Sequence, residues 1–305
     1  MAREPDGRWD ATKHGSRKPG ADTGATGFAL LCYYGWGVKH NAKGHYAEPT
    51  RKAIEWLIKQ QKADGDLRGG GDMYCHGIAS IALCEAYGIT KDPKLKQPAE
   101  KAIRFILKAQ DEKLGGWRYQ PGRGSDTSVT GWQFMAMHSA RMADLQVPDD
   151  RFTMVGRWLD SVASGSQKGL YGYTGGRDVR PAMVATGMFR RQLDLVPPTD
   201  RRMQESTEYL KNNSVARHKD YYYIYYGTLA LYQHQGAIWE KWNEEMKEFV
   251  LVMQKKDGAD KGSWDPGRGH GATGGRVVST TMAILSLEVY YRLLPMYGFR
   301  DNGEK

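Results

Sequence analysis

The feature that most constrains the fold is a repeat that runs along almost the whole chain. A two-residue word recurs early in six apolar segments, as Thr26-Gly27, His76-Gly77, Thr130-Gly131, Thr186-Gly187, Tyr226-Gly227 and Thr280-Thr281. Successive copies lie 40 to 56 residues apart, with a mean of about 51. Spacing of this order is typical of solenoids, propellers and closed arrays. The sequence therefore predicts a repeat architecture.

Each repeat contains two helices of different character. Segments that begin near the recurring words carry little charge and are rich in Ala, Leu and Met; they are expected at 21–36, 71–88, 126–143, 180–194, 219–235 and 276–294. The segments that precede most of them are amphipathic, with apolar residues at i, i+3 and i+4, and are expected at 50–61, 97–110, 150–163, 200–212 and 243–255. Alternating inner and outer helices predict an all-α fold, a single (α/α)6 toroid.

The repeat also bears on domain organisation. It is unbroken from residue 22 to residue 292, so we expect one domain over 1–305, although the length alone would suggest about two. Residues 1–20 resemble the tail of an incomplete first repeat that lacks its outer helix, which points to a chain excised from a longer protein. No apolar run approaches the ~18–20 residues that a membrane-spanning helix needs, and no apolar N-terminal segment of the secretory kind is present.

The amino-acid composition indicates the cellular compartment and limits the classes of binding partner. The three cysteines, Cys32, Cys75 and Cys84, are too few for a disulfide scaffold and favour a reducing compartment such as the cytoplasm. Lys and Arg number 44 against 35 Asp and Glu, but the basic residues are dispersed. Because no basic run with interleaved aromatics is present, we do not expect a nucleic-acid partner. Other domains or subunits of a longer protein are further candidate partners.

A second signature joins outer helices to the loops that follow them. The outer helix ends in Gln, and a short loop with acidic residues and glycines leads to Trp, from Gln110 to Trp117 and from Gln254 to Trp264. These segments resemble the QW repeats of squalene/hopene cyclases and protein prenyltransferase β subunits, and the resemblance covers nearly the whole chain. It implies the toroid fold and an apolar, isoprenoid-like ligand in a central cavity. The Gln side chain is suited to hold the helix end or the next loop, and the glycines permit sharp turns.

The candidate site follows from the direction of the inner helices, whose N-terminal ends should meet on one rim of the cavity. The expected catalytic residues are Asp126, Asp72 and His76, and the expected ligand-binding residues are Asp22, Arg180, Tyr222, Tyr226 and Arg276. The arginines and helix ends would receive an anionic head, and the tyrosines would line the cavity. Aspartate at a helix start is also a preferred N-cap, so capping alone accounts for the aspartates as well.

The resemblance leaves the reaction open. Class II terpenoid cyclases carry Asp-x-Asp-Asp-Thr-Ala at the start of one inner helix, and the middle Asp donates the proton. Only Asp126 and Thr127 survive in the matching stretch, where Ser125 stands at the donor position. A hydroxyl group cannot protonate an alkene, so the chain is not established as an enzyme. Asp126 acting alone would need a pKa raised by burial.

Three alternatives remain. Prenyltransferases hold zinc with Asp, Cys and His at inner-helix N-termini, so Asp72, Cys75 and His76 could ligate zinc here. Adjacent helical residues point about 100° apart, which counts against Cys75 and His76 sharing an ion. The toroid could also be a non-catalytic scaffold for protein partners. Carbohydrate is a further ligand class, because paired-helix toroids rich in aromatics and carboxylates occur among polysaccharide lyases.

Overall fold

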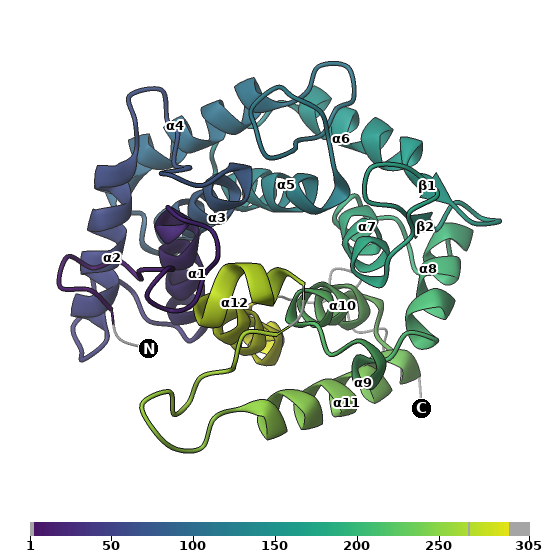
Figure 1. Cartoon of the computed structure of the whole chain (residues 1–305). Coiled ribbons are helices and arrows are strands. Elements are labelled where there is room, and N and C mark those ends of the chain that lie inside the picture. The colour runs from purple at the N-terminus through teal and green to yellow at the C-terminus, as the bar shows by residue number, and fades with distance from the viewer. Residues whose placement is uncertain (1–2, 268, 293–305) are drawn as a thin grey trace, which may run out of the picture.

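A computed structural model describes residues 3–267 and 269–292, and its helices form two concentric rings (Figure 1). The inner ring consists of α1 (Asp22–Gly35), α3 (Met73–Thr90), α5 (Thr127–Met142), α7 (Pro181–Leu193), α10 (Tyr221–His234) and α12 (His270–Leu287). The outer ring consists of α2 (Ala47–Gln60), α4 (Pro93–Ala109), α6 (Asp149–Ser161), α8 (Arg201–Lys211) and α11 (Ala237–Met253). Each inner helix contacts the next, and α12 contacts α1. The predicted all-α toroid is confirmed.

Four further elements are short; three of them were not predicted, and the fourth, Val289–Arg292, lies within the helix predicted at 276–294. They are the helices α9 (Val215–His218) and α13 (Val289–Arg292) and the antiparallel strands β1 (Ala163–Ser164) and β2 (Leu170–Tyr171). The last inner helix also begins earlier than the predicted residue 276, because α12 has an extra first turn and a kink at Gly275, where φ is 76°. The predicted end of this helix, residues 293–294, lies outside the described residues.

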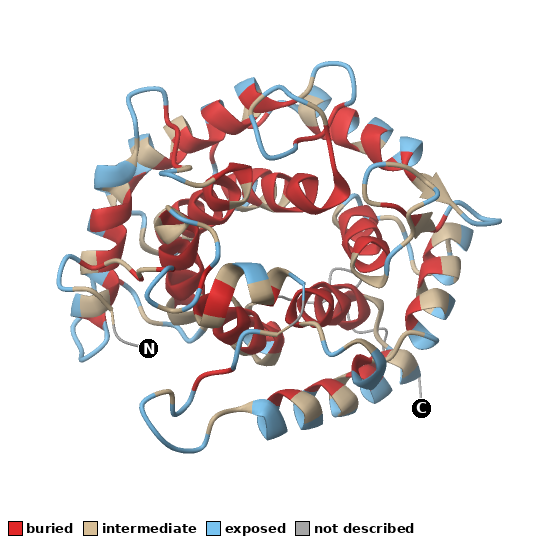
Figure 2. Cartoon of the chain, in the orientation of Figure 1, coloured by how far each residue is buried: buried red, intermediate tan, exposed pale blue. Residues whose placement is uncertain are grey.

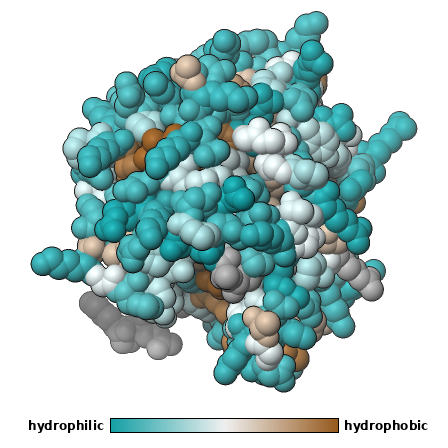
Figure 3. All heavy atoms as spheres, turned by 60° about the vertical axis from the view of Figure 1, so that its left-hand side comes forward, coloured by the Kyte–Doolittle hydropathy of each residue, from teal (hydrophilic) through white to brown (hydrophobic). Residues whose placement is uncertain are grey.

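The two rings differ in burial as the sequence predicts. The inner helices are buried nearly all round, whereas the outer helices bury one stripe and expose the other (Figure 2). On α2, Ile54 and Leu57 are at most 1% exposed, and Ile106 on α4 is fully buried. Burying one such side chain contributes about 1.5–3 kcal/mol to the free energy of folding. On the side of the ring that carries α2, hydrophilic residues cover most of the surface (Figure 3).

The recurring glycines let neighbouring elements approach closely. A Cβ atom at Gly27 would lie 3.1 Å from the backbone of Ala79 on α3, and one at Gly227 would lie 2.4 Å from the indole of Trp242 on α11. A Cβ atom at Gly187 would lie 2.4 Å from the ring of Tyr171. The distance at Gly27 is tighter than most real Cβ contacts, and those at Gly187 and Gly227 are shorter than real Cβ atoms show, so a larger residue would push the neighbouring elements apart.

The QW segments fasten the outer ring. Gln110 donates from Nε2 to the carbonyl oxygens of Gly115 at 2.8 Å and of Arg151, on the next outer helix, at 3.1 Å. Trp117 donates from Nε1 to the carbonyl oxygen of Ile106 at 2.8 Å. Gln254 and Trp264 make the corresponding bonds to Gly262 and Val250. These residues hold helices and loops together at a distance from the centre of the ring.

In several repeats the first residue of the recurring two-residue word anchors the preceding loop. The hydroxyls of Thr130 and Thr280 accept hydrogen bonds from the backbone N–H groups of Trp117 at 3.0 Å and Trp264 at 3.1 Å. The hydroxyl of Thr26 accepts from the backbone N–H of Trp9 at 3.0 Å. Trp9 therefore makes the same contact as the tryptophans of the later repeats.

No helix in the described ranges contains an apolar stretch long enough to cross a bilayer.

Candidate functional site

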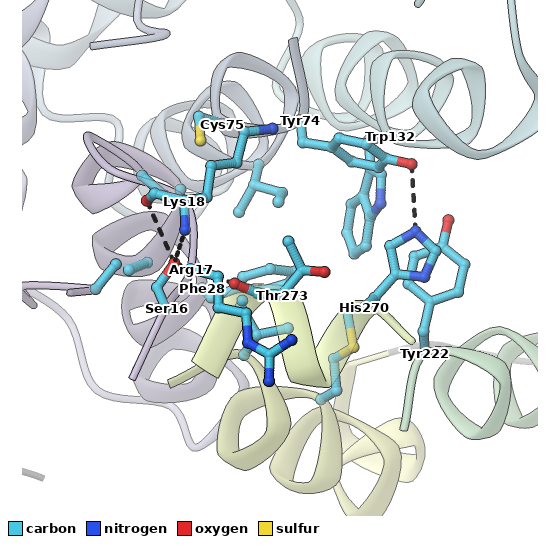
Figure 4. A pocket seen from close by; sticks show the side chains of 18 of the residues that line it. Ser16, Arg17, Lys18, Phe28, Tyr74, Cys75, Trp132, Tyr222, His270 and Thr273 are labelled. Carbon is cyan, nitrogen blue, oxygen red and sulfur yellow. Dashed lines mark hydrogen bonds between the residues drawn. The ribbon is translucent and has the colours of Figure 1, made fainter. Parts of the chain in front are cut away.

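The N-terminal ends of the inner helices surround a cavity of about 570 Å³ (Figure 4). Residues from α1, α3, α5, α10 and α12 line this N-terminal cavity, together with the segment 16–18 and Tyr119. The gathering of helix ends on one face, expected from the repeat, thus produces a pocket. Among the described residues, α7 contributes none of the lining.

The walls of the N-terminal cavity are mainly aromatic and aliphatic. Phe28 meets Trp132 edge to face with ring centroids 5.2 Å apart, and Trp132 lies 6.4 Å from Tyr222. Further lining side chains are Tyr74, Tyr119, Ile78, Val278 and Met282. Within the described lining there is no carboxylate. The cavity is therefore suited to apolar or unsaturated surface.

Hydroxyl groups and one imidazole form a connected network on one wall. Tyr74 donates to Ser128 Oγ at 2.7 Å, and Ser128 also bonds to the hydroxyl of Tyr222. His270 Nε2 lies 3.3 Å from the Tyr74 hydroxyl, and the imidazole stacks on Tyr222 with centroids 3.9 Å apart. Burial lowers the pKa of His270 to about 4. Because the neutral ring must donate from Nε2 to Tyr74, its Nδ1 is an acceptor.

Basic groups lie at the edge of the cavity. Lys18 forms an ion pair with Asp72, and its ammonium lies 5.8 Å from the ring centroids of both Tyr74 and Tyr119. Arg17 also lines the cavity, is exposed, and has no ion-pair partner in the described part of the chain. The Arg17 backbone N–H donates to the carbonyl oxygen of Thr273 at 2.9 Å, which holds this segment against α12.

Some predicted residues reach the N-terminal cavity. Tyr222 and Cys75 line it directly, and burial raises the pKa of the Cys75 thiol. Asp72 meets the cavity through its ion pair with Lys18, while its other oxygen accepts from the backbone N–H of Tyr74 at 3.0 Å. Asp72 is therefore an N-cap as well as the partner of a lining cation.

Asp126 lies behind the cavity wall. Its Oδ1 accepts from the backbone N–H of Val129 at 2.7 Å, and its Oδ2 accepts from the Tyr173 hydroxyl at 3.1 Å. The hydroxyls of Tyr173 and Tyr119 are 2.5 Å apart, and Tyr119 lines the cavity. Burial raises the pKa of Asp126 to about 6. This carboxyl group is connected to the cavity through two phenols.

The other predicted ligand-binding residues are engaged elsewhere. Asp22 accepts from the backbone N–H of Ala11 at 2.9 Å, and Arg180 pairs with Asp178 at 2.7 Å. Arg276 pairs with Asp265 at 2.6 Å, in the loop before α12. Tyr226 is fully buried and packs on Trp132 with centroids 5.5 Å apart.

The cations on the cavity, Arg17 and Lys18, were missed from the sequence. They stand in the loop directly before α1, within residues 1–20, which resemble the tail of an incomplete repeat. A cluster of basic residues next to the start of an inner helix was the available signal. The hydrogen bond between Arg17 and Thr273 on α12 joins segments that are far apart in the sequence, so no local sequence pattern could predict it.

The candidate zinc ligands do not fit a zinc site. His76 Nδ1 accepts from the backbone N–H of Leu67 at 3.0 Å, and Nε2 bonds to the carbonyl oxygen of Ala102 at 3.1 Å, so both nitrogens are occupied. His76 thus takes the loop-anchoring place that threonine fills in other repeats. The described residues contain no group of three or more His, Cys, Asp or Glu placed to hold a metal ion.

Comparisons with known proteins agree on the fold. No protein-family model matches the chain, and no curated protein is similar to it in sequence. An inactive variant of the GH76A α-1,6-mannanase of Salegentibacter sp. HEL1_6, in complex with α-1,6-mannotetrose, superposes with a TM-score of 0.62 at 11% identity, covering 88% of each chain. A variant of the type II terpene cyclase MstE from Scytonema, in complex with geranylgeranyl dihydroxybenzoate, has a TM-score of 0.61 at 14% identity, covering 95% of this chain and 94% of the cyclase. An α-amylase from Clostridium perfringens has a TM-score of 0.59 at 12% identity, covering 88% and 85%.

These similarities establish a toroid fold that is shared by a terpene cyclase and by glycoside hydrolases. The cyclase-like resemblance read from the QW segments is therefore one of several fold relationships. At such identities the fold alone is shown, so the function has to be argued from the cavity itself.

Proposed function

We propose that the N-terminal cavity binds an elongated apolar ligand of isoprenoid type with an anionic end. The observation that carries the proposal is a cavity of about 570 Å³ with aromatic walls, no carboxylate among its described lining residues, and two cations at its edge. The volume lies in the ~300–1,000 Å³ range of small-molecule sites.

The apolar part of the ligand would supply most of the affinity. Burial of ~200 Å² of hydrocarbon contributes about 5 kcal/mol before the entropic cost of binding is subtracted. The faces of Trp132 and Tyr222 suit unsaturated carbon, and Ile78 and Met282 add aliphatic contact. At the edge, Arg17 is the better partner for an anionic end, because Asp72 already neutralises Lys18.

A sugar-cleaving site is less well supported, although glycoside hydrolases share the fold. Hydrolysis of a glycosidic bond generally uses two carboxyl groups that face the substrate. The described lining of the N-terminal cavity offers neutral groups and cations, and Asp126 stands behind Tyr119 and Tyr173. The geometry therefore supports ligand binding better than hydrolysis. If the bound ligand also reacts, Asp126 is the candidate acid.

Titration calorimetry with defined probes tests the proposal. Farnesyl diphosphate should bind, farnesol should bind more weakly, and α-1,6-mannotriose should not bind. Val278→Trp would fill the cavity from α12 and should abolish binding, whereas the matched Val252→Trp, on the exposed face of α11, should leave it unchanged. Binding of the oligosaccharide alone, or isoprenoid binding that survives Val278→Trp in a folded variant, would contradict the proposal.

A further inference from the structure

A second cavity occupies the opposite end of the toroid. It has a volume of about 360 Å³, and all six inner helices supply lining residues from their C-terminal halves. Trp132 lines the N-terminal cavity and Tyr225 lines this C-terminal cavity, and their rings are stacked with centroids 5.6 Å apart. The two cavities are thus separate sites on either side of an aromatic layer.

The electrostatic character of the C-terminal cavity differs from that of the first. The C-terminal ends of the inner helices carry partial negative charge and converge here. Glu85 and Arg292 line the cavity and pair at 2.6 Å, and Arg292 also donates to the carbonyl oxygen of Leu31 at 3.2 Å. Glu288 lies close to this pair, and its buried Oε2, which packs against the lining residue Gly35, has no hydrogen-bond partner among the described residues. Two carboxyl groups therefore face one guanidinium group.

A buried hydroxyl also lacks a partner. Tyr34 lines the C-terminal cavity and is 7% exposed, and its hydroxyl bonds to no group in the described part of the chain. A buried polar atom without a partner costs about 1–3 kcal/mol, which a bound ligand can recover. Burial keeps His138, a further lining residue, neutral by lowering its pKa to about 4, so it adds no positive charge.

The remaining walls would hold an apolar body. Tyr34, Phe189 and Tyr225 present aromatic rings, and Leu229 and Leu285 present aliphatic chains. Aromatic faces attract cations through their quadrupoles, and the attraction grows when the cation is desolvated. Negative helix ends, an unpaired carboxylate oxygen and aromatic walls all favour the same class of ligand.

We propose that the C-terminal cavity is a second binding site, for a small organic ammonium ion with an apolar body. The ammonium group would donate hydrogen bonds to the Tyr34 hydroxyl and to Glu288, and the aromatic residues would enclose its hydrocarbon part. The site is independent of the ligand proposed for the N-terminal cavity, because Trp132 and Tyr225 lie between the two.

Calorimetry at pH 8 with phenethylammonium, 2-phenylethanol and 3-phenylpropionate tests this proposal. The ammonium ion should bind about tenfold more tightly than the alcohol or the carboxylate. Tyr34→Phe keeps the ring and removes only the hydroxyl, and Glu288→Gln removes only the charge; each should weaken ammonium binding by about fivefold. Ser139→Trp, which fills the C-terminal cavity, should abolish binding, and Val278→Trp in the other cavity should leave it unchanged.

Equal affinity for the three probes would overturn the proposed cation selectivity. Loss of ammonium binding in Val278→Trp, with retention in a folded Ser139→Trp variant, would overturn the location. Circular dichroism and melting temperature identify variants that fail to fold, and Tyr34→Phe, which preserves packing, decides the question if Glu288→Gln does not fold. Failure of isoprenoid binding would leave these results unaffected, so the two proposals are tested separately.

Discussion

The hydroxyl groups of Tyr119 and Tyr173 lie 2.5 Å apart, and they join the buried carboxyl group of Asp126 to the N-terminal cavity. Tyr173 donates to Asp126, so Tyr119 donates to Tyr173. The chain of hydrogen bonds ends at a residue that lines the cavity. An acid without direct access to a ligand is therefore still coupled to the site.

Asp126→Asn should reduce the pH dependence of stability. The folded-state pKa of Asp126, about 6, is above its ordinary value of 3.8, so the folded state holds the proton more tightly than the unfolded state. The associated stability is present below pH 4 and is lost as the pH rises through 6, by about 3 kcal/mol. Asparagine preserves the N-cap. Melting temperatures from pH 4 to 8 check this, and an unchanged slope would show that Asp126 titrates normally.

Gln110→Ala should destabilise the protein more than Gln254→Ala. Gln110 is buried and bonds to two carbonyl oxygens, including one on the next outer helix, whereas the bond of Gln254 to Gly262 is exposed. Leaving buried carbonyl groups unpaired costs about 1–3 kcal/mol. Urea unfolding measures the difference, and equal losses would argue against the buried cross-link as the source of stability.

Gly187→Ala should destabilise, while Gly156→Ala should be neutral or stabilising. A Cβ atom at Gly187 would lie 2.4 Å from the Tyr171 ring, whereas one at Gly156 would lie 3.4 Å from Arg190 Nη2, which is an ordinary van der Waals contact. Overpacking costs about 1–3 kcal/mol, and alanine in the middle of α6 gains about 0.5–1 kcal/mol over glycine. Thermal unfolding of both variants provides the test; a stable Gly187→Ala variant would contradict the close-approach explanation.

His76→Ala should destabilise the protein irrespective of metal. The substitution removes the acceptor for the Leu67 N–H group and the partner of the Ala102 carbonyl, at a cost of about 2 kcal/mol or more. Chelator treatment of the unmodified protein should leave its melting temperature unchanged. A fall in melting temperature on chelation, absent from His76→Ala, would restore His76 as a metal ligand.

Arg17→Ala should weaken binding of farnesyl diphosphate and leave farnesol binding unchanged. Arg17 is exposed and makes no side-chain ion pair among the described residues, so its removal should not affect folding. A hydrogen bond between two charged groups contributes about 1.5–3 kcal/mol, or roughly tenfold or more in affinity. Calorimetry measures both ligands, and Arg180→Ala is the control, because Arg180 is held by Asp178. Equal losses for both ligands in Arg17→Ala would exclude a head-group role.

The periodic sequence determined the ring by itself. The inner and outer helices follow from local signals: N-capping aspartates at α3 and α5, amphipathic spacing on α2 and α4, and a recurring glycine at a close approach in five of the six inner helices. Because these signals repeat in phase, they also determined that the helix N-termini meet on one face.

Only the tertiary structure decided which side chains face the cavities. His76, Arg180 and Arg276 share the predicted rim positions, yet His76 is turned to a carbonyl oxygen of the outer helix α4, and the two arginines are turned to nearby carboxylates. Arg17, Lys18 and His270 reach the N-terminal cavity because the segment before α1 meets α12 there, across more than 250 residues of sequence. A local pattern fixes the direction of a helix, but the orientation and partner of a polar side chain depend on contacts between segments that are distant in sequence.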